Sequence, residues 1–173
     1  FYLPNKFILF LLYNMIQATT ESDFIFYIQT EDNRIDTSAA TSKIRHLLKF
    51  TNEMDKSIHY VYATAQEIYE RYTKFEVDYD STPSVYTSVN LKPAGYYQFE
   101  IYEVVWSGTV TISSGNAPVN ENDVLTPAAS TKGVVKGLVT KGKMYVADKS
   151  GTEQVKYTQH PEPSGSNYIY YGQ

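Results

Sequence analysis

The sequence predicts an all-β protein, an antiparallel sandwich of two sheets with one long surface loop and an extended C-terminal arm. From Asp23 onward, apolar and polar side chains alternate in short runs, which is the pattern of half-buried strands. These runs recur roughly every 8–12 residues and are separated by turn-forming residues, as is typical of sandwiches and barrels. The chain shows no internal repeat, heptad or extended amphipathic helix.

Composition narrows the class of protein further. The 173 residues are 42% hydrophobic and 20% charged, which suits one folded domain with peripheral segments. The net charge of −4 and the isoelectric point near 5.4 disfavour nucleic-acid binding, because that requires clustered Lys and Arg. Since there is no cysteine, disulfides and thiolate metal sites are excluded, and stability must come from burial and sheet hydrogen bonds.

The chain divides into a leader, one domain and an arm. The leader, residues 1–14, holds an apolar run at 7–13 that is too short to span a bilayer, so we expect no membrane span. This run imitates a signal peptide but lacks an initiating Met and a small-x-small cleavage site. We therefore expect non-native upstream translation ahead of a start at Met15, with a signal peptide as the alternative. We expect the sandwich to cover residues 15–148, and the linker and arm to cover 149–173.

The first part of the domain predicts a strand and a hairpin. Phe24, Phe26 and Ile28 alternate on one face of the first strand. Two β-rich runs, 44–50 and 58–63, flank a connection of about five residues and predict antiparallel pairing. With the turn centred on Met54, one face carries Leu48, Phe50, Ile58, Tyr60 and Tyr62, and the other carries Arg45, Lys49 and His59. A slip of one residue would reverse this assignment.

The middle of the chain combines strand patterns with one helical segment. Residues 65–72 have helical composition but allow at most about two turns, so we expect a short helical connector. Two alternating sets predict the next strands, namely Phe75, Val77 and Tyr79, then Val85, Thr87, Val89 and Leu91. After a turn at 92–95, the residues Tyr97, Phe99 and Ile101 give the clearest strand, which we expect to be central.

The last third predicts a long loop between strands, followed by a tail. We expect a short edge strand at 109–112, then a surface loop at 113–131, where loop-forming residues dominate. Glycines and alternating residues at 133–147 predict a closing hairpin. The tail contains a Pro-, Gly- and Ser-rich linker at 160–166 and ends in a short β-forming peptide.

Motifs for metal binding and nucleophilic catalysis are missing from the sequence. The three histidines, His46, His59 and His160, have no metal-ligand spacing, and the predicted hairpin register places the first two on opposite faces. There is no G-x-S-x-G nucleophile motif and no phosphate-binding loop. We therefore expect no cofactor and no metal site.

Paired carboxylates are the remaining route to catalysis. Glu76 or Glu100 could approach Asp78 on neighbouring strands at the spacing used in glycoside hydrolysis. Such pairs are common on solvated sheet faces, and nothing else in the sequence points to a hydrolase. We therefore expect that the protein is not an enzyme.

Two compositional features predict contacts with other proteins. Positive charge concentrates in six lysines of the last third, whereas residues 53–80 are on balance acidic, so opposite ends could attract in a repeating assembly. The alternative is the protection of an edge strand by lysine. The six are Lys132, Lys136, Lys141, Lys143, Lys149 and Lys156.

Tyrosine is the second feature, because 17 tyrosines offer large contact area at little entropic cost. The predicted assembly interface is the peptide after the linker, Tyr168, Ile169, Tyr170 and Tyr171. We expect this peptide to add as a strand to a neighbouring subunit. A disordered tail is the alternative.

The order of these signals resembles a group of small β-rich virion-associated proteins of tailed phages that infect Bacteroidetes, the relatives of the crAss-like phages. The likeness covers residues 15–147 and lies in KIRHLLKFTN, SIHYVYATA, ERYTKFEV, NLKPAGYYQFEIYEV and GKMYV. It implies an immunoglobulin-like sandwich without enzymatic residues, located in the virion. The implied role is a capsid-associated, neck or tail component that contacts copies of itself and other virion proteins.

This chain departs from the family pattern in its loop at 113–131 and in its tyrosine tail, which leaves its place in the particle open. The alternative function is a secreted bacterial carbohydrate- or surface-binding module, in which exposed tyrosines stack on sugar rings.

Overall fold

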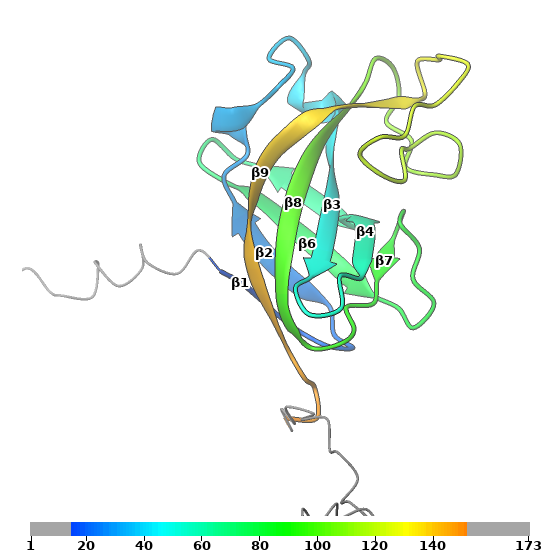
Figure 1. Cartoon of the computed structure of the whole chain (residues 1–173). Helices are drawn as coiled ribbons and strands as arrows, with labels where there is room; N and C mark the ends of the chain where they lie inside the picture. The colour runs from blue at the N-terminus through cyan, green and yellow to red at the C-terminus, as the bar shows by residue number, and fades with distance from the viewer. Residues whose placement is uncertain (1–14, 152–173) are drawn as a thin grey trace, which may run out of the picture.

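The computed structural model describes residues 15–151 (Figure 1), and strands dominate this part of the chain. The predicted all-β class is confirmed. The strands are β1 (Ile16–Thr19), β2 (Phe24–Ile28), β3 (Ile44–Asn52), β4 (Ile58–Tyr62), β5 (Ala65–Ile68), β6 (Thr73–Tyr79), β7 (Ser88–Val89), β8 (Gly95–Trp106) and β9 (Gly133–Ala147). Two short 3-10 turns, η2 (Glu31–Asn33) and η3 (Thr41–Lys43), lie between β2 and β3.

The strands form two sheets that pack face to face (Figure 1). The larger sheet has the order β1-β9-β8-β3-β4, and the smaller has the order β2-β6-β5, with β7 also beside β6. The pair β1 and β9 is parallel, as is the pair β6 and β7, so the expectation of a purely antiparallel sandwich is wrong at these two places. A period-two pattern places side chains on faces but carries no information about strand direction.

The core between the sheets is built from the alternating residues of both. The predicted faces of β2, β6 and β8 are confirmed, because Phe26, Phe75 and Phe99 all lie buried in this core. As predicted, β8 is central, since it pairs with β9 on one side and with β3 on the other. The full set is Ile16, Ala18, Phe24, Phe26, Leu48, Phe50, Val61, Ala63, Phe75, Val77, Val89, Leu91, Tyr97, Phe99, Ile101, Met144 and Val146.

The glycines of β9 make room for aromatic rings. A Cβ atom on Gly133 would lie 2.6 Å from the Trp106 ring, and one on Gly142 would lie 2.7 Å from the Phe99 ring. The predicted hairpin at 133–147 is therefore wrong. These glycines do not turn the chain; they lie in one continuous strand and leave space for the rings of β8. Register shifts against β8 leave Lys136 and Val139 as extra residues, which is the signature of bulges.

The hairpin of β3 and β4 exists, but its predicted register is wrong by one residue. Phe50 lies opposite His59, and Leu48 lies opposite Val61, so these four side chains share the inner face. Asn52 fixes the turn, since its side-chain oxygen accepts hydrogen bonds from the backbone N–H groups of Met54 and Asp55 at 2.7 and 3.3 Å. The turn is therefore centred between Met54 and Asp55 rather than on Met54.

Three other predicted elements are wrong. Residues 65–72 form β5 and a turn rather than a helix, because β6 offers backbone pairing that outweighs a marginal two-turn helix. Of the strand predicted from Val85 to Leu91, only β7 forms. Residues 109–112 form no strand, and they lie instead in a loop that runs from the end of β8 to the start of β9.

The prediction of a long surface loop is confirmed by residues 107–132 (Figure 1, yellow-green). This loop packs on the outer face of the larger sheet and forms a second apolar cluster there. Trp106 and Tyr62 are buried beneath it, with Ala117 packed against them. The Tyr62 hydroxyl donates a hydrogen bond to the carbonyl of Pro118 at 2.8 Å. The loop is thus held to the sheet by side chains from β4 and β8.

His46 on β3 predicts a pH dependence of stability. Its ring is 1% exposed and lies 5.5 Å from the Phe75 ring, and Nδ1 contacts Oε1 of Gln66 at 3.1 Å. Burial lowers the pKa of His46 to about 4. The unfolded chain therefore binds a proton before the folded one does, so stability is lost as the pH falls from about 6.5 towards about 4.

We expect the free energy of unfolding to fall by about 2 kcal/mol between pH 7 and pH 5 because of this one group. Urea unfolding at both pH values measures the difference. The variant His46→Leu should lose most of this pH dependence, whereas His59→Gln should retain it. Equal slopes for the wild type and His46→Leu would contradict the assignment.

Candidate functional site

Few of the residues singled out in the sequence are brought together by the fold. Glu76 and Asp78 share the outer face of β6, where Glu76 forms an ion pair with Lys74. His46 and His59 share the inner face of the larger sheet, so the prediction of opposite faces is wrong, but no cluster of three metal-ligating side chains forms within residues 15–151. Glu100 points from the outer face of the larger sheet and Asp78 from that of the smaller sheet, so this carboxylate pair does not form. The predicted interface peptide, Tyr168, Ile169, Tyr170 and Tyr171, and the leader at 1–14 lie outside the described residues.

An exposed group of aromatic rings covers one end of the smaller sheet. We call Tyr27, Tyr69 and Tyr72 the tyrosine cluster. The Tyr27 and Tyr72 ring centroids are 5.5 Å apart, and those of Tyr69 and Tyr72 are 4.8 Å apart. The three side chains are 41–59% exposed, and Ile25 beside Tyr27 on β2 is 52% exposed. Rings that pack on one another yet face solvent offer a rigid amphipathic surface for a partner.

The turn between β5 and β6 presents two of these rings. The N–H of Tyr69 donates to the carbonyl of Tyr72 at 2.9 Å, which closes the turn. The Tyr69 hydroxyl donates to a carboxylate oxygen of Glu67 at 2.5 Å. The first bond fixes the backbone that carries both rings, the second holds the Tyr69 side chain, and the Tyr72 ring packs between those of Tyr27 and Tyr69, so the cluster is preorganised.

A groove of about 600 Å³ lies next to the tyrosine cluster, at the seam between the two sheets. Its walls include Tyr27 and Tyr72 from the smaller sheet, and Ile16 and Thr140 from the larger. It opens where β1 begins, and no other described strand covers this part of the seam.

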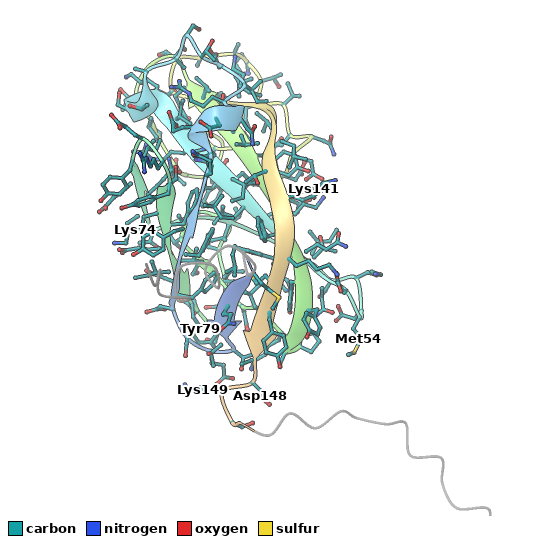
Figure 2. All side chains as sticks on the ribbon, turned by 90° about the vertical axis from the view of Figure 1, so that its left-hand side faces the viewer. Met54, Lys74, Tyr79, Lys141, Asp148 and Lys149 are labelled. Carbon is teal, nitrogen blue, oxygen red and sulfur yellow. The ribbon has the colours of Figure 1, made fainter. Side chains whose placement is uncertain are left out.

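The edge of β9 beside this groove has no strand partner among the described strands. β1 pairs only with residues 144–147 of β9, and within residues 15–151 the backbone hydrogen bonds of 134–143 are made with β8 alone. Lys136, Lys141 and Lys143 are exposed along this stretch. Figure 2 views this side of the molecule and shows Lys141 projecting at one flank and Lys74, on the smaller sheet, at the other. We call residues 134–143 the open edge.

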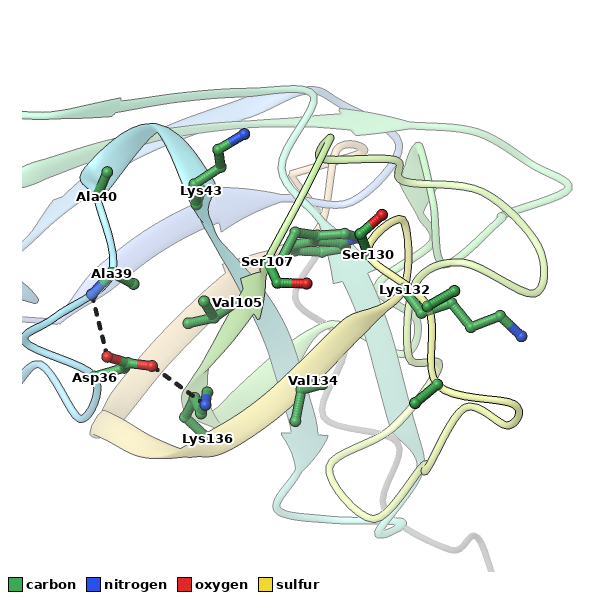
Figure 3. Close-up of a pocket in the computed structure, with 13 residues that line it drawn as sticks. Asp36, Ala39, Ala40, Lys43, Val105, Ser107, Ser130, Lys132, Val134 and Lys136 are labelled. Carbon is green, nitrogen blue, oxygen red and sulfur yellow. Dashed lines mark hydrogen bonds and ion pairs between the residues drawn. The ribbon is translucent and has the colours of Figure 1, made fainter.

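A second groove, of about 630 Å³, flanks the start of the open edge (Figure 3). Asp36 lies in its wall and faces Lys136, with 3.2 Å between Oδ2 and Nζ. Hydrogen bonds from Ser38 and from Lys136 lower the pKa of Asp36 to about 2. Lys43 and Lys132 also line the groove, so its charge is positive on balance.

A charged cluster holds the loop 107–132 to the outer face of the larger sheet. Nζ of Lys49 lies 2.7 Å from Oε1 of Glu121 and 3.0 Å from Oε2 of Glu100. The Tyr60 hydroxyl donates to Oε2 of Glu121 at 2.5 Å. Burial alone would lower the pKa of Lys49, but hydrogen bonds to Glu121 and Glu100 raise it; burial and the bond to Glu121 raise the pKa of Tyr60 to about 12.

We expect Glu121→Gln to loosen this loop rather than unfold the domain. The ion pair is partly exposed, so its loss should change the free energy of unfolding by about 1 kcal/mol or less. Burial would raise the pKa of Glu121, but Lys49 and Tyr60 outweigh it and lower the pKa. The contact is therefore present above pH ~4.5 and is lost as the pH falls further.

Amide hydrogen exchange measures this effect. Residues 113–125 should exchange faster in Glu121→Gln than in the wild type, with the rest of the domain unchanged. Glu67→Gln, which removes an exposed carboxylate far from the loop, is the control. Unchanged exchange in the loop would show that Glu121 does not hold it.

The residues that sequence reasoning missed come together only through long-range contacts. Glu121 and Lys49 are 72 positions apart, and no motif links them. The tyrosine cluster could have been found, because residues 69–72 hold two tyrosines in the turn between two alternating runs. The open edge could not have been found from the sequence, because the order of strands in the sheet decides which part of β9 is paired.

No protein-family model, curated protein or solved structure matches this chain. Within residues 15–151, no helix has the length and apolar character needed to cross a membrane. The fold and surface thus define a class, an all-β protein of two packed sheets with an exposed tyrosine cluster beside an open, lysine-bearing strand edge.

Proposed function

We propose that this protein is a structural component of a tailed-phage particle, associated with the capsid, neck or tail, and that it works by binding copies of itself and other virion proteins. The observation that carries the proposal is the tyrosine cluster lying beside the open edge of β9. Exposed aromatic side chains and unpaired strand edges are features through which β proteins contact other proteins. The sequence resemblance implies the same role and an immunoglobulin-like arrangement of the sheets.

Binding rather than catalysis is the proposed activity, because the ionisable groups with buried or close partners are engaged in structural contacts. Glu100 and Glu121 both bind Lys49. The buried carboxylate of Glu103 accepts hydrogen bonds from two backbone N–H groups, and His46 contacts Gln66. Each of these contacts ties one segment of the fold to another.

The proposal is tested by assembly. Purified protein should form concentration-dependent oligomers or bind particles of the phage whose genome encodes it. Genes for a portal, terminase or capsid protein should lie near its own gene. The double variant Tyr27→Ser and Tyr72→Ser should weaken this binding, whereas Tyr96→Ser on the other sheet should not. A protein that stays monomeric at high concentration and binds no virion protein would refute the proposal.

A carbohydrate- or surface-binding module of a secreted bacterial protein is the second candidate, favoured by a separate pair of rings. Tyr96 and Tyr145 lie opposite each other on β8 and β9, with ring centroids 5.1 Å apart, and Tyr96 is 54% exposed. Such a pair can stack on a sugar ring. Specific binding on a glycan array that Tyr96→Ala abolishes would favour this function over assembly.

A further inference from the structure

The open edge of β9 has a stretch suited to one short strand. β1 shows that this edge accepts a four-residue strand, because residues 16–19 pair with 144–147. The next four positions of β9, residues 140–143, are free of bulges and keep regular register with β8. Beyond them the bulge at Val139 interrupts the edge, so pairing that starts next to β1 ends after about four residues.

The side chains of an added strand would have a place to go. The groove beside Thr140 lies on the inner side of this stretch and contains the rings of Tyr27 and Tyr72. Lys141 and Lys143 lie exposed on the outer side. A strand with aromatic residues at successive positions would therefore place alternate rings on the two sides of the sheet. Those on the inner side would pack against Tyr27 and Tyr72 in the groove, and those on the outer side would lie beside the lysine side chains.

Charge selects among possible occupants. If the β9 edge of a second copy paired with this one, the lysines of both edges would approach each other, and like charges on paired strands are destabilising. The C-terminal segment from residue 157 contains no Lys or Arg and one Glu, so it brings no such repulsion. It also contains Tyr168, Ile169, Tyr170 and Tyr171, four β-forming residues in a row.

We propose that residues 140–143 of β9, together with the groove lined by Tyr27 and Tyr72, are the acceptor site for the segment 168–171 of a second copy of this chain. Sixteen residues, 152–167, separate that segment from the described domain, enough for an extended reach of about 55 Å to a neighbour. The segment adds as one strand that pairs with β9 of the neighbour, in line with β1, and extends the larger sheet along that edge. This inference rests on the proposed assembly function and names the contact that serves it.

The first experiment uses chain shortened to residues 1–158 and a fluorescent peptide of residues 164–173. The peptide should bind the shortened chain, and Tyr72→Ser should weaken binding at least about tenfold, equivalent to ~1.4 kcal/mol. Tyr96→Ser, which removes another exposed tyrosine ring away from the groove, should change binding less than about twofold. The absence of peptide binding, or equal affinity for the Tyr72 variant and the wild type, would overturn the proposal.

The second experiment separates a neighbour's arm from other occupants by measuring molar mass in solution. Full-length chain should form oligomers that the shortened chain does not, and added peptide should dissociate them. A full-length monomer that does not bind the peptide would show that the arm occupies the open edge of its own chain. Peptide binding only to a chain that starts at Met15 would show that the leader occupies that edge. Either result overturns the proposal.

If the shortened chain oligomerises as the full-length chain does, the acceptor site is wrong while the proposed function stands. If neither form binds copies or virion proteins, the proposed function itself fails.

Discussion

Replacing Glu103 by alanine should lower the free energy of unfolding by roughly 3–5 kcal/mol, because two hydrogen bonds to its buried carboxylate would be lost. Glu103 lies on β8 with no exposed surface, and its carboxylate oxygens accept hydrogen bonds from the N–H groups of Ile35 and Asp36 at 3.1 and 2.8 Å. These bonds attach the segment between β2 and β3 to the larger sheet. Guanidinium unfolding measures the loss.

Two further variants make this prediction specific to the hydrogen bonds. Glu103→Gln keeps one acceptor oxygen and should cost roughly half as much as alanine. Glu100→Ala, on the outer face of the same strand, should cost about 1 kcal/mol or less. If the alanine variants at 100 and 103 were equally stable, the buried carboxylate would not be anchoring the segment.

Phe75→Ala should destabilise the protein by a similar amount, roughly 3–5 kcal/mol, because it empties the centre of the core between the sheets. Phe75 has no exposed surface, and its ring packs 5.0 Å from Phe26 and 5.5 Å from His46. It therefore links β2 and β6 of the smaller sheet to β3 of the larger one. Thermal and denaturant unfolding both report the effect.

The matched control is Tyr27→Ala, which removes a similar ring from the outer face of the neighbouring strand. Tyr27 is 59% exposed, so its loss should change stability by no more than about 0.5 kcal/mol. Similar losses for the two variants would mean that the contacts between the sheets do not dominate stability.

The strands that could be predicted from sequence are those with one buried and one solvated face. In β6 and β8, the alternation of Phe75 and Val77, and of Tyr97, Phe99 and Ile101, reflects burial directly. Strand β5 could not be predicted, because β6 imposes its conformation on a segment whose own composition favours helix.

Register and direction were beyond the sequence for physical reasons. The slip in the hairpin of β3 and β4 follows from the side chain of Asn52, which organises a turn one residue longer than the hydrophobic pattern implies. The glycines of β9 look like turn residues, yet their role is to leave space for Phe99 and Trp106.

The candidate site was predictable in kind but not in place. Abundant tyrosine and clustered lysine pointed to a contact surface, and the fold locates described members of both groups at the seam beside β9. Among the described strands, β1 pairs with residues 144–147 of β9 alone, and no residue pattern predicts that this pairing covers only part of β9.

The parallel pairing of β1 with β9 also orders events during synthesis. Among the described strands, the first to leave the ribosome is β1, and its sheet partner is the last, β9, so the larger sheet cannot close until nearly all of the described chain has emerged. Until then the apolar face of β1 can pack against β2, which follows it in the chain, but its edge lacks the pairing with β9. A cell that makes many copies at once would contain many such incompletely folded molecules. They avoid aggregation only if the larger sheet closes faster than two of them collide.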